Sequence, residues 1–219
     1  MMINGKEVRI DVGANLRGAN LEGANLKYAN LKYVNLECAN LKYANLECAH
    51  LEYANLEDAN LRGANLKSAH LEDANLKYVN LEDANLRGAN LEDANLKYVH
   101  LEYANLRDAN LRYANLRSAH LEDASLKDAQ YALISMFQIN WGNLSDELTL
   151  ELMRHDAESC GEEAMNNWAK TDECPFSNNL KRDFYFQEKK ELWQPGVPKL
   201  RGMQLFKALC KEKNIQISY

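Results

Sequence analysis

Histidine and cysteine supply the side chains of this sequence that are best suited to catalysis. In the last part of the chain, His155, Cys160 and Cys174 are the only candidates for a nucleophile and its base. A catalytic thiol needs a nearby base and a cationic or helix-start environment. The surrounding charges are instead negative, at Asp156, Glu158, Glu162 and Glu163. The sequence therefore predicts no catalytic residue, and we expect that the protein is not an enzyme.

The five cysteines show no spacing typical of a structural site. They are Cys38, Cys48, Cys160, Cys174 and Cys210, and no two of them form a CxxC pair. An odd number without such a pair favours reduced thiols over a disulfide framework or a zinc site.

Four further histidines are spaced by twenty residues, His50 with His70 and His100 with His120. If residues twenty apart stack, each pair presents two imidazoles side by side. Two exposed histidines without a third ligand make a poor metal site, and each of these occupies a position where asparagine usually stands. We therefore expect no metal and no cofactor.

These histidines belong to a five-residue repeat that runs from Ala14 to Gln130. From Leu16 to Leu126 every fifth residue is leucine, and alanine or, more rarely, valine stands two residues before it. On an α-helix five residues advance by about 500°, so the leucines would spiral around every face. On a continuous strand an odd period would send alternate leucines to opposite faces. The period is explained if Ala-Asn-Leu is a short extended side pointing in, out and in, and the next two residues form a corner.

The number of sides per coil follows from a longer repeat. Residues 71–90 match residues 91–110 except at Asn80/His100, Asp83/Tyr103 and Gly88/Asp108, and a shift by one pentapeptide gives many more mismatches. A unit of four pentapeptides predicts four sides, although a recent duplication would leave the same trace. The stretch then makes about six coils, which at a strand spacing of about 4.8 Å give a rod of roughly 25 to 30 Å.

This uninterrupted tandem of Ala-Asn-Leu and two variable residues resembles the pentapeptide-repeat family. The resemblance covers residues 14–130 and implies a right-handed quadrilateral β-helix, an all-β solenoid. Family members with an assigned role range from topoisomerase inhibitors to developmental regulators. The resemblance therefore implies the fold of the rod but leaves its function open.

Sorting the corner residues by a stride of twenty predicts two acidic faces. One carries Glu52, Glu72, Asp73, Glu92 and Asp93, and the other carries Glu82, Asp83, Glu102, Glu122 and Asp123. A basic column lies between them, at Lys27, Lys67, Arg87, Arg107 and Lys127, interrupted by Glu47. A solvated surface is the simpler interpretation. The alternative, implied by the resemblance, is a DNA-mimicking modulator of a type II topoisomerase such as gyrase, acting through the acidic faces.

The segments outside the repeat differ from it in composition. Residues 1–13 contain an Asn4-Gly5 turn signal followed by alternation at Val8, Ile10 and Val12, and we expect a β cap on the first coil. Residues 131–219 hold every phenylalanine and tryptophan of the chain and predict a mainly helical C-terminal domain. The expected helices span about 145–159, 162–170, 180–192 and 200–214, with a closing strand at 215–217. Phe176 and Trp193 are candidate anchors for a partner, although packing in a core is the more common fate of such aromatic side chains.

The charge and hydropathy of the whole chain argue against two further classes of protein, nucleic-acid-binding proteins and membrane proteins. A net charge of −6 does not favour direct binding to nucleic acid. No apolar run approaches the roughly 20 residues that a membrane span needs, and no signal-peptide core begins the chain. We therefore expect a cytoplasmic, non-enzymatic scaffold whose rigid rod presents a C-terminal module that binds another protein. A homodimer through the C-terminal region is compatible with the same sequence.

Overall fold

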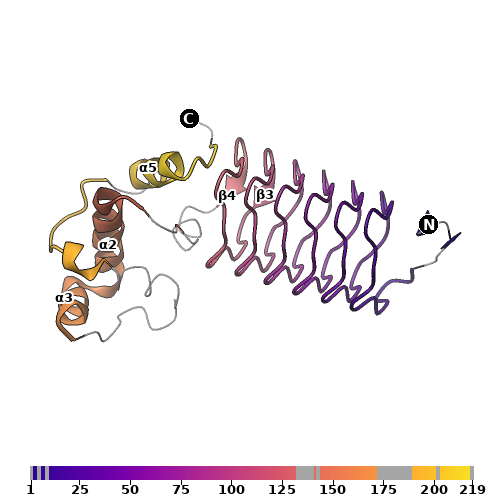
Figure 1. The fold of residues 1–219 in the computed structure, drawn as a ribbon, viewed down its shortest axis with the longest axis horizontal. Helices are drawn as coiled ribbons and strands as arrows, with labels where there is room; N and C mark the ends of the chain where they lie inside the picture. The colour runs from indigo at the N-terminus through magenta and orange to yellow at the C-terminus, as the bar shows by residue number, and fades with distance from the viewer. Residues whose placement is uncertain are drawn as a thin grey trace. The chain divides into compact units, whose positions relative to one another are not determined.

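The chain forms two compact units. The computed structural model describes residues 2–3, 6–7, 10–131, 141, 144–171, 189–200 and 203–217 (Figure 1). Unit 1 consists of Met1–Ile139 together with Lys213–Tyr219, and unit 2 consists of Asn140–Glu212. The expected C-terminal domain, 131–219, is longer than unit 2 at both ends, because residues 131–139 and 213–219 belong to unit 1.

Unit 1 is a rod of stacked four-sided coils (Figure 1). Residues twenty apart pair as parallel bridges along the whole repeat, and one column joins Asn15, Asn35, Asn55, Asn75, Asn95 and Asn115. The prediction of four pentapeptides per coil and six coils is therefore confirmed. The longest ladders are β3 (Asn110–Leu111) and β4 (Gln130–Tyr131), which pair in parallel.

Each extended side is paired through its backbone with the coils on both sides. Leu76 N donates to Asn95 O at 2.8 Å, and Asn95 N donates to Ala74 O at 2.9 Å. The asparagine side chains form a second ladder, in which Asn95 Nδ2 donates to Asn75 Oδ1 at 3.1 Å. Asn75 Oδ1 also accepts from the corner amide of Lys77 at 3.3 Å. The outward asparagine side chains thus form both ladder bonds between coils and turn bonds to the corners.

The corners are tight turns whose second residue has a left-handed backbone. At one corner Val79 N donates to Leu76 O at 3.2 Å, and the intervening Tyr78 has φ +59°. The same conformation occurs at corners with glycine, such as Gly88 at φ +65°, and at corners with aspartate, such as Asp93 at φ +59°. A left-handed residue at this position is typical of a type II turn. Because residues other than glycine are strained there, the pairing between coils must hold these corners in place.

The interior of the rod is filled by the alanine and leucine columns. Leu76 and Leu96 are each 1% exposed, and Ala74 and Ala94 are fully buried. Burying one leucine contributes on the order of 1.5 to 3 kcal/mol. The predicted in, out, in pattern of Ala-Asn-Leu is confirmed.

The two ends of the rod are built differently. At the beginning of the chain, β1 (Met2–Ile3) pairs antiparallel with β2 (Lys6–Glu7); the predicted turn residues Asn4 and Gly5 lie outside the described residues. Val12 is 56% exposed, so the expected alternation does not bury it. At the last coil, Leu126 N donates to Gln216 O at 2.6 Å and Gln216 N donates to Ala124 O at 2.8 Å. The predicted closing strand at 215–217 thus adds a parallel segment to the rod.

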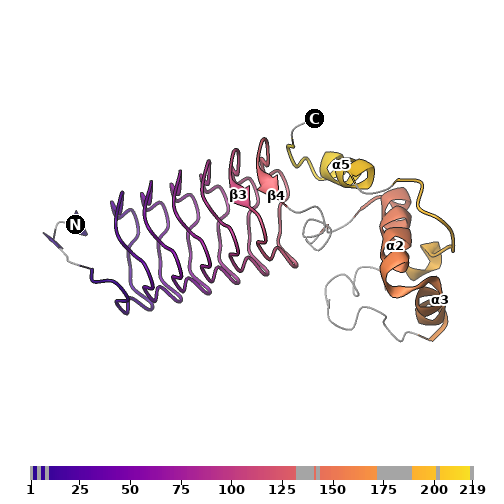
Figure 2. The same ribbon diagram turned by 180° about the vertical axis from the view of Figure 1, so that it is seen from behind.

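Unit 2 contains α2 (Asp146–Cys160), α3 (Glu162–Thr171), the 3-10 turn η1 (Lys190–Leu192) and α5 (Met203–Glu212). Within this unit α2 contacts α3, α5 and η1 (Figure 2). Ser145 caps α2, as the sequence predicts, because its side chain accepts from Leu148 N. Most of the helix expected at 180–192 lies outside the described residues. None of the described helices has the length and apolar character needed to cross a membrane.

Hydrogen bonds of polar side chains connect the segments of unit 2. The Glu151 side chain is buried and accepts from Lys199 N at 2.6 Å, Leu200 N at 2.8 Å and Arg154 Nη1 at 3.0 Å. Arg154 Nε in turn donates to Gln194 O at 3.2 Å. One buried carboxylate therefore connects α2 to the segment that precedes α5.

Candidate functional site

The glutamates of the first predicted acidic face are part of the rod's own hydrogen-bond network. They occupy the first corner position and are partly buried. Glu72 Oε1 accepts from Asn90 Nδ2 at 2.5 Å, and Glu92 Oε2 accepts from Asn110 Nδ2 at 3.0 Å. These carboxylates are therefore less available to a partner than their position in the sequence indicates.

The aspartates of that face occupy the second corner position and are exposed. Neither Asp73 nor Asp93 forms an ion pair with a lysine or arginine within the described part of the chain. The charge of Asp73, and a hydrogen bond to it, raise the pKa of the Tyr53 phenol above its ordinary value. Asp73 and Asp93 are thus the acidic groups of this face that a partner can reach.

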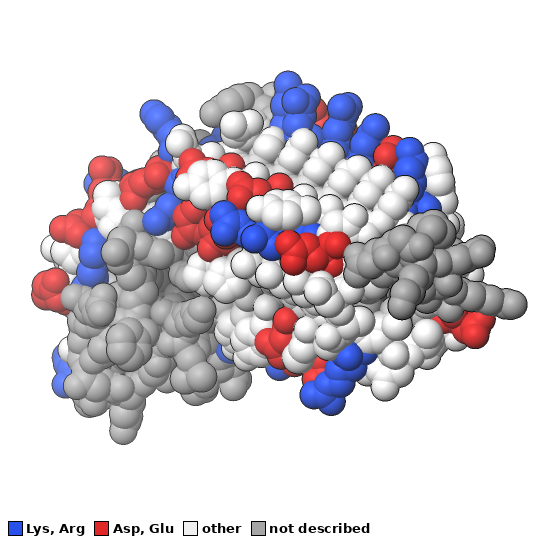
Figure 3. Space-filling view, turned by 45° about the vertical axis from the view of Figure 1, so that its right-hand side comes forward, with Lys and Arg blue, Asp and Glu red and all other residues white. Residues whose placement is uncertain are grey.

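The second predicted acidic face is partly neutralised. Arg62 Nη2 lies 3.1 Å from Glu82 Oε1 and 3.4 Å from Asp83 Oδ2. On the basic column, Lys27 Nζ lies 3.0 Å from Glu47 Oε2 and Arg87 Nε lies 3.1 Å from Asp108 Oδ2. Figure 3 accordingly shows acidic and basic side chains next to one another on the face in view. The remaining residues of the second predicted acidic face are Glu102, Glu122 and Asp123, and they lie along the last two coils.

Tyrosines form a second exposed feature of the corners. Tyr33 and Tyr53 stack with ring centroids 5.1 Å apart, and Tyr78 and Tyr98 stack at 4.9 Å. Lys77 Nζ lies 4.6 Å from the Tyr78 ring centroid. Tyr33 and Tyr53 are more than half exposed. These stacked tyrosines therefore form short ladders on the surface of the rod.

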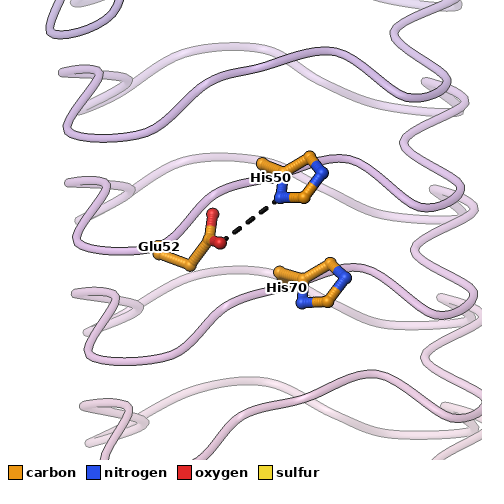
Figure 4. Close-up of side chains that lie close together, drawn as sticks. All are labelled: His50, Glu52 and His70. Carbon is orange, nitrogen blue, oxygen red and sulfur yellow. Dashed lines mark hydrogen bonds and ion pairs between the residues drawn. The ribbon is translucent and has the colours of Figure 1, made fainter.

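A glutamate lies beside each pair of stacked histidines, and it is a third potential metal ligand that the sequence analysis did not identify. The rings of His50 and His70 are stacked with centroids 4.8 Å apart, and His50 Nδ1 lies 3.3 Å from Glu52 Oε1 (Figure 4). One potential ligand atom from each of His50, Glu52 and His70 lies within 4.8 Å of the other two. The signal in the sequence was the triplet His-Leu-Glu, because its histidine is the outward residue in the middle of one side and its glutamate begins the adjoining corner.

The same arrangement recurs at His100, Glu102 and His120. The two rings stack at 4.8 Å, and Glu102 Oε1 lies 3.2 Å from His100 Nδ1 and 3.8 Å from His120 Nδ1. The two clusters are fifty residues apart, which is two and a half coils, so they lie on opposite sides of the rod. Each of them offers two imidazoles and one carboxylate.

The Glu52 carboxylate is charged at neutral pH. Burial alone would raise its pKa, but hydrogen bonds from Lys32, from its own backbone amide and from His50 outweigh burial and leave the pKa below its ordinary value. Lys32 Nζ lies 2.9 Å from Glu52 Oε1. The first cluster therefore contains a fixed cation as well as an anion.

The residues singled out in the tail do not form a site among the described residues. Trp193 is 9% exposed and its indole Nε1 donates to Asn166 Oδ1 at 2.9 Å, so its side chain is packed within unit 2. Burial raises the pKa of the Cys210 thiol to about 12, which keeps it protonated. Phe176 and Cys174 lie outside the described residues, as does the side chain of Cys160.

Comparison with known proteins identifies the repeat. A family described as pentapeptide repeats matches in 8 copies, over residues 12–42, 35–60, 54–93 and 89–128. These matches together cover just over half of the chain. No curated protein gives a match.

Solved structures also match the chain, and the first two named below are described as pentapeptide repeat proteins. HetL from the cyanobacterium Nostoc sp. strain PCC 7120, a protein involved in heterocyst differentiation regulation, is 34% identical, and the match covers 55% of this chain and 65% of HetL with a TM-score of 0.38. Rfr23 from the cyanobacterium Cyanothece 51142 is 27% identical over 55% of this chain and 90% of Rfr23, with a TM-score of 0.31. QnrB1, a plasmid-mediated fluoroquinolone resistance protein, is 19% identical over 50% of this chain and 58% of QnrB1, with a TM-score of 0.36. The matched region is thus less than two thirds of HetL and of QnrB1.

Proposed function

Because the chain belongs to the pentapeptide-repeat family, whose fold is a right-handed quadrilateral β-helix, we propose that it is a non-enzymatic scaffold for protein interaction. In this proposal the rod is a rigid support, and the helical unit 2 binds another protein. Pentapeptide-repeat proteins are generally structural or interaction proteins, which supports a non-enzymatic role.

The filled interior of the rod is the observation that carries this proposal. Every leucine from Leu26 to Leu126 is at most 1% exposed, and the alanine columns beside them are almost as fully buried. Such a core leaves no space for a substrate between the four sides. Recognition by unit 1 therefore has to use its outer surface, where part of the charge is neutralised by ion pairs between coils.

The regular pairing between coils supports the role of rigid support. Each coil is bonded to the next through the backbone of its sides and corners, with N to O distances of about 2.7 to 3.1 Å along the middle of the rod. Unit 2 has an irregular sequence that does not repeat from coil to coil, and its exposed side chains therefore offer a surface unlike that of the rod. We therefore assign the partner-binding role to unit 2.

A pull-down with two forms of the protein tests this assignment. One bait is the full chain, and the other lacks residues 140–212 but keeps residues 213–219, because Gln216 pairs with Ser125 in the last coil. We expect the shortened bait to lose the specific partners of the full chain. Identical sets of partners would contradict the role given to unit 2. A cooperative thermal transition of the shortened bait controls for its folding.

A matched surface variant tests whether the tyrosine ladder contributes. Tyr33→Asn with Tyr53→Asn removes one stacked pair and keeps residues that tolerate a left-handed backbone. If unit 2 binds the partner, this variant of the full chain retains it. If the tyrosine variant loses the partner while the unaltered full chain retains it, the partner binds the rod, because tyrosine is favoured at protein interfaces.

A second candidate function is modulation of a type II topoisomerase by DNA mimicry, and the exposed Asp73 and Asp93 favour it. A DNA channel attracts such acidic groups because cations line it. The test is gyrase supercoiling at micromolar protein, with a variant in which Glu72, Asp73, Glu92 and Asp93 are replaced by their amides. Inhibition that the variant abolishes would support mimicry, and the absence of any effect of the unaltered protein would exclude it.

A further inference from the structure

The two His-Glu-His clusters are built alike on opposite sides of the rod. We propose that each of them, His50 with Glu52 and His70, and His100 with Glu102 and His120, binds one Zn²⁺ ion. This inference concerns unit 1 alone and does not depend on the partner of unit 2.

The spacing of the ligand atoms is set by the stacking of the coils. One ligand atom from each residue of a cluster lies within 4.8 Å of the other two. Tetrahedral zinc with Zn–N distances of about 2.0 to 2.1 Å holds its ligand atoms roughly 3.3 Å apart. Closing this difference requires the two stacked rings to tilt toward each other by side-chain rotation. His50 and His70 are 43% and 44% exposed, so their rings have room to turn without a change in the backbone.

The unused carboxylate oxygens are a second observation that points to a ligand. In both clusters Oε1 of the glutamate faces the histidine nitrogens, whereas Oε2 of Glu52 and Oε2 of Glu102 are buried and have no hydrogen-bond partner among the described residues. A buried carboxylate oxygen without a partner is unfavourable. A cation at the histidines would compensate this oxygen as well as the one already directed at them.

The chemical types of the three ligand atoms indicate which metal ion each cluster prefers. Two imidazole nitrogens and one carboxylate oxygen are the protein ligands of many zinc sites that leave a fourth position for water. Calcium and magnesium prefer sites made wholly of oxygen atoms, and thiolate-seeking ions would need cysteine. The clusters therefore favour zinc over the common alkaline-earth ions.

The two sites differ in the charges around them, and this difference predicts their order of affinity. Lys32 Nζ lies 2.9 Å from Glu52 Oε1, so an ion at the first cluster must compete with a lysine. Glu102 has no lysine or arginine partner within the described residues, and its column neighbours twenty residues away are Glu82 and Glu122. We expect the cluster at His100 to bind Zn²⁺ more tightly than the cluster at His50.

The experiment is a titration of the metal-free, reduced full chain with Zn²⁺ in competition with a chromophoric chelator of micromolar affinity. We expect two bound equivalents of different affinity. His50→Asn with His70→Asn should remove the weaker equivalent, and His100→Asn with His120→Asn the tighter one. Asparagine occupies these positions in most other coils, so the variants preserve the ladder, and unchanged melting temperatures will show it. His155→Asn is the matched control and should keep both equivalents.

Two further variants distinguish zinc bound at the histidine clusters from zinc bound elsewhere on the chain. Lys32→Gln should increase the affinity of the weaker site several-fold, because it removes the competing cation, and should leave the other site unchanged. Cys38→Ser with Cys48→Ser should leave the stoichiometry at two. Absence of saturable binding, binding that survives replacement of all four histidines, or loss of binding in the cysteine variant would overturn the proposal. A single equivalent would overturn it for the cluster whose replacement has no effect.

Discussion

The rod and the helical unit are stabilised by two different kinds of interaction. In the rod, backbone bonds and identical apolar columns repeat from coil to coil, so the backbone and core contacts of one residue recur twenty positions away. In unit 2, single side chains such as Glu151 and Trp193 make contacts that occur once. The comparison shows that in the rod stability is distributed over many equivalent positions, whereas in unit 2 it depends on a few particular ones.

The largest expected effect is the loss of the rod when a charge is placed in its core. Leu76→Asp buries an unpaired carboxylate at a position that is 1% exposed and should destabilise the rod by more than about 4 kcal/mol. Circular dichroism and thermal unfolding measure the change. Lys67→Asp, at an exposed corner, is the control and should have little effect. A soluble Leu76→Asp protein with an unaltered melting temperature would contradict the description of the core.

The second prediction concerns a contact that occurs once in unit 2. Glu151→Ala leaves Arg154 and the amides of Lys199 and Leu200 without their acceptor, and we expect a loss of about 3 kcal/mol. All tryptophans of the chain lie in unit 2, so tryptophan fluorescence follows the unfolding of this unit alone. Glu191→Ala, at an exposed position, is the matched control. Equal shifts in the two variants would mean that the buried carboxylate does not hold unit 2 together.

A smaller effect, an increase in stability, is expected from a substitution at a corner of the rod. Tyr103 has φ +60° and its side chain is 60% exposed. Tyr103→Asn should stabilise the rod by up to about 1 kcal/mol, because asparagine tolerates a left-handed backbone better than tyrosine does. Arg107→Asn, at the first residue of the next corner, has no such strain to relieve and should bring no gain. Chemical denaturation of the two variants measures the difference, and a lower stability of Tyr103→Asn would show that ring contacts outweigh the strain.

The smallest effect is expected from a decrease in pH, which should lower the melting temperature of the rod. Hydrogen bonds from Lys77 and Asn75 lower the pKa of Glu57 below its ordinary value of 4.5, and the pKa of Glu52 is lowered as well. A carboxyl whose pKa is lower in the folded state contributes stability above pH 4.5 that is lost as the pH falls through the folded pKa. The melting temperature of the rod should therefore decrease below pH 4.5. In a variant with Glu52→Gln and Glu57→Gln this decrease should be shallower, and an identical pH dependence would contradict the prediction.

The sequence predicted the rod in detail because its contacts are periodic. The four sides, the buried alanine and leucine columns and the stacked pairs Tyr33–Tyr53 and His50–His70 all follow from a stride of twenty residues. Individual polar contacts did not follow from that stride. Glu52 lies between Lys32 and His50, and this placement depends on side-chain torsions that a list of columns does not contain.

Unit 2 was predicted less completely for the same reason. The helix near Ser145 could be placed from its cap and its apolar spacing, and the structure begins α2 at Asp146. The burial of Glu151 could not be predicted, because it depends on Lys199 and Leu200, which are 48 and 49 residues away. The sequence favoured packing of Trp193 in a core, but it did not identify the partner Asn166. Long-range packing of a sequence without repeats has no local signal.

The pairing of Gln216 with Ser125 also has a consequence for biosynthesis. Residues 213–217 leave the ribosome only after all of residues 140–212 have been made, so the final coil has to wait for its last hydrogen-bonding partner. The earlier coils can stack as they emerge, since each one needs only the coil before it. In the nascent chain the leading end of the rod is therefore completed during translation, and its trailing end is completed after the helical segment has been synthesised.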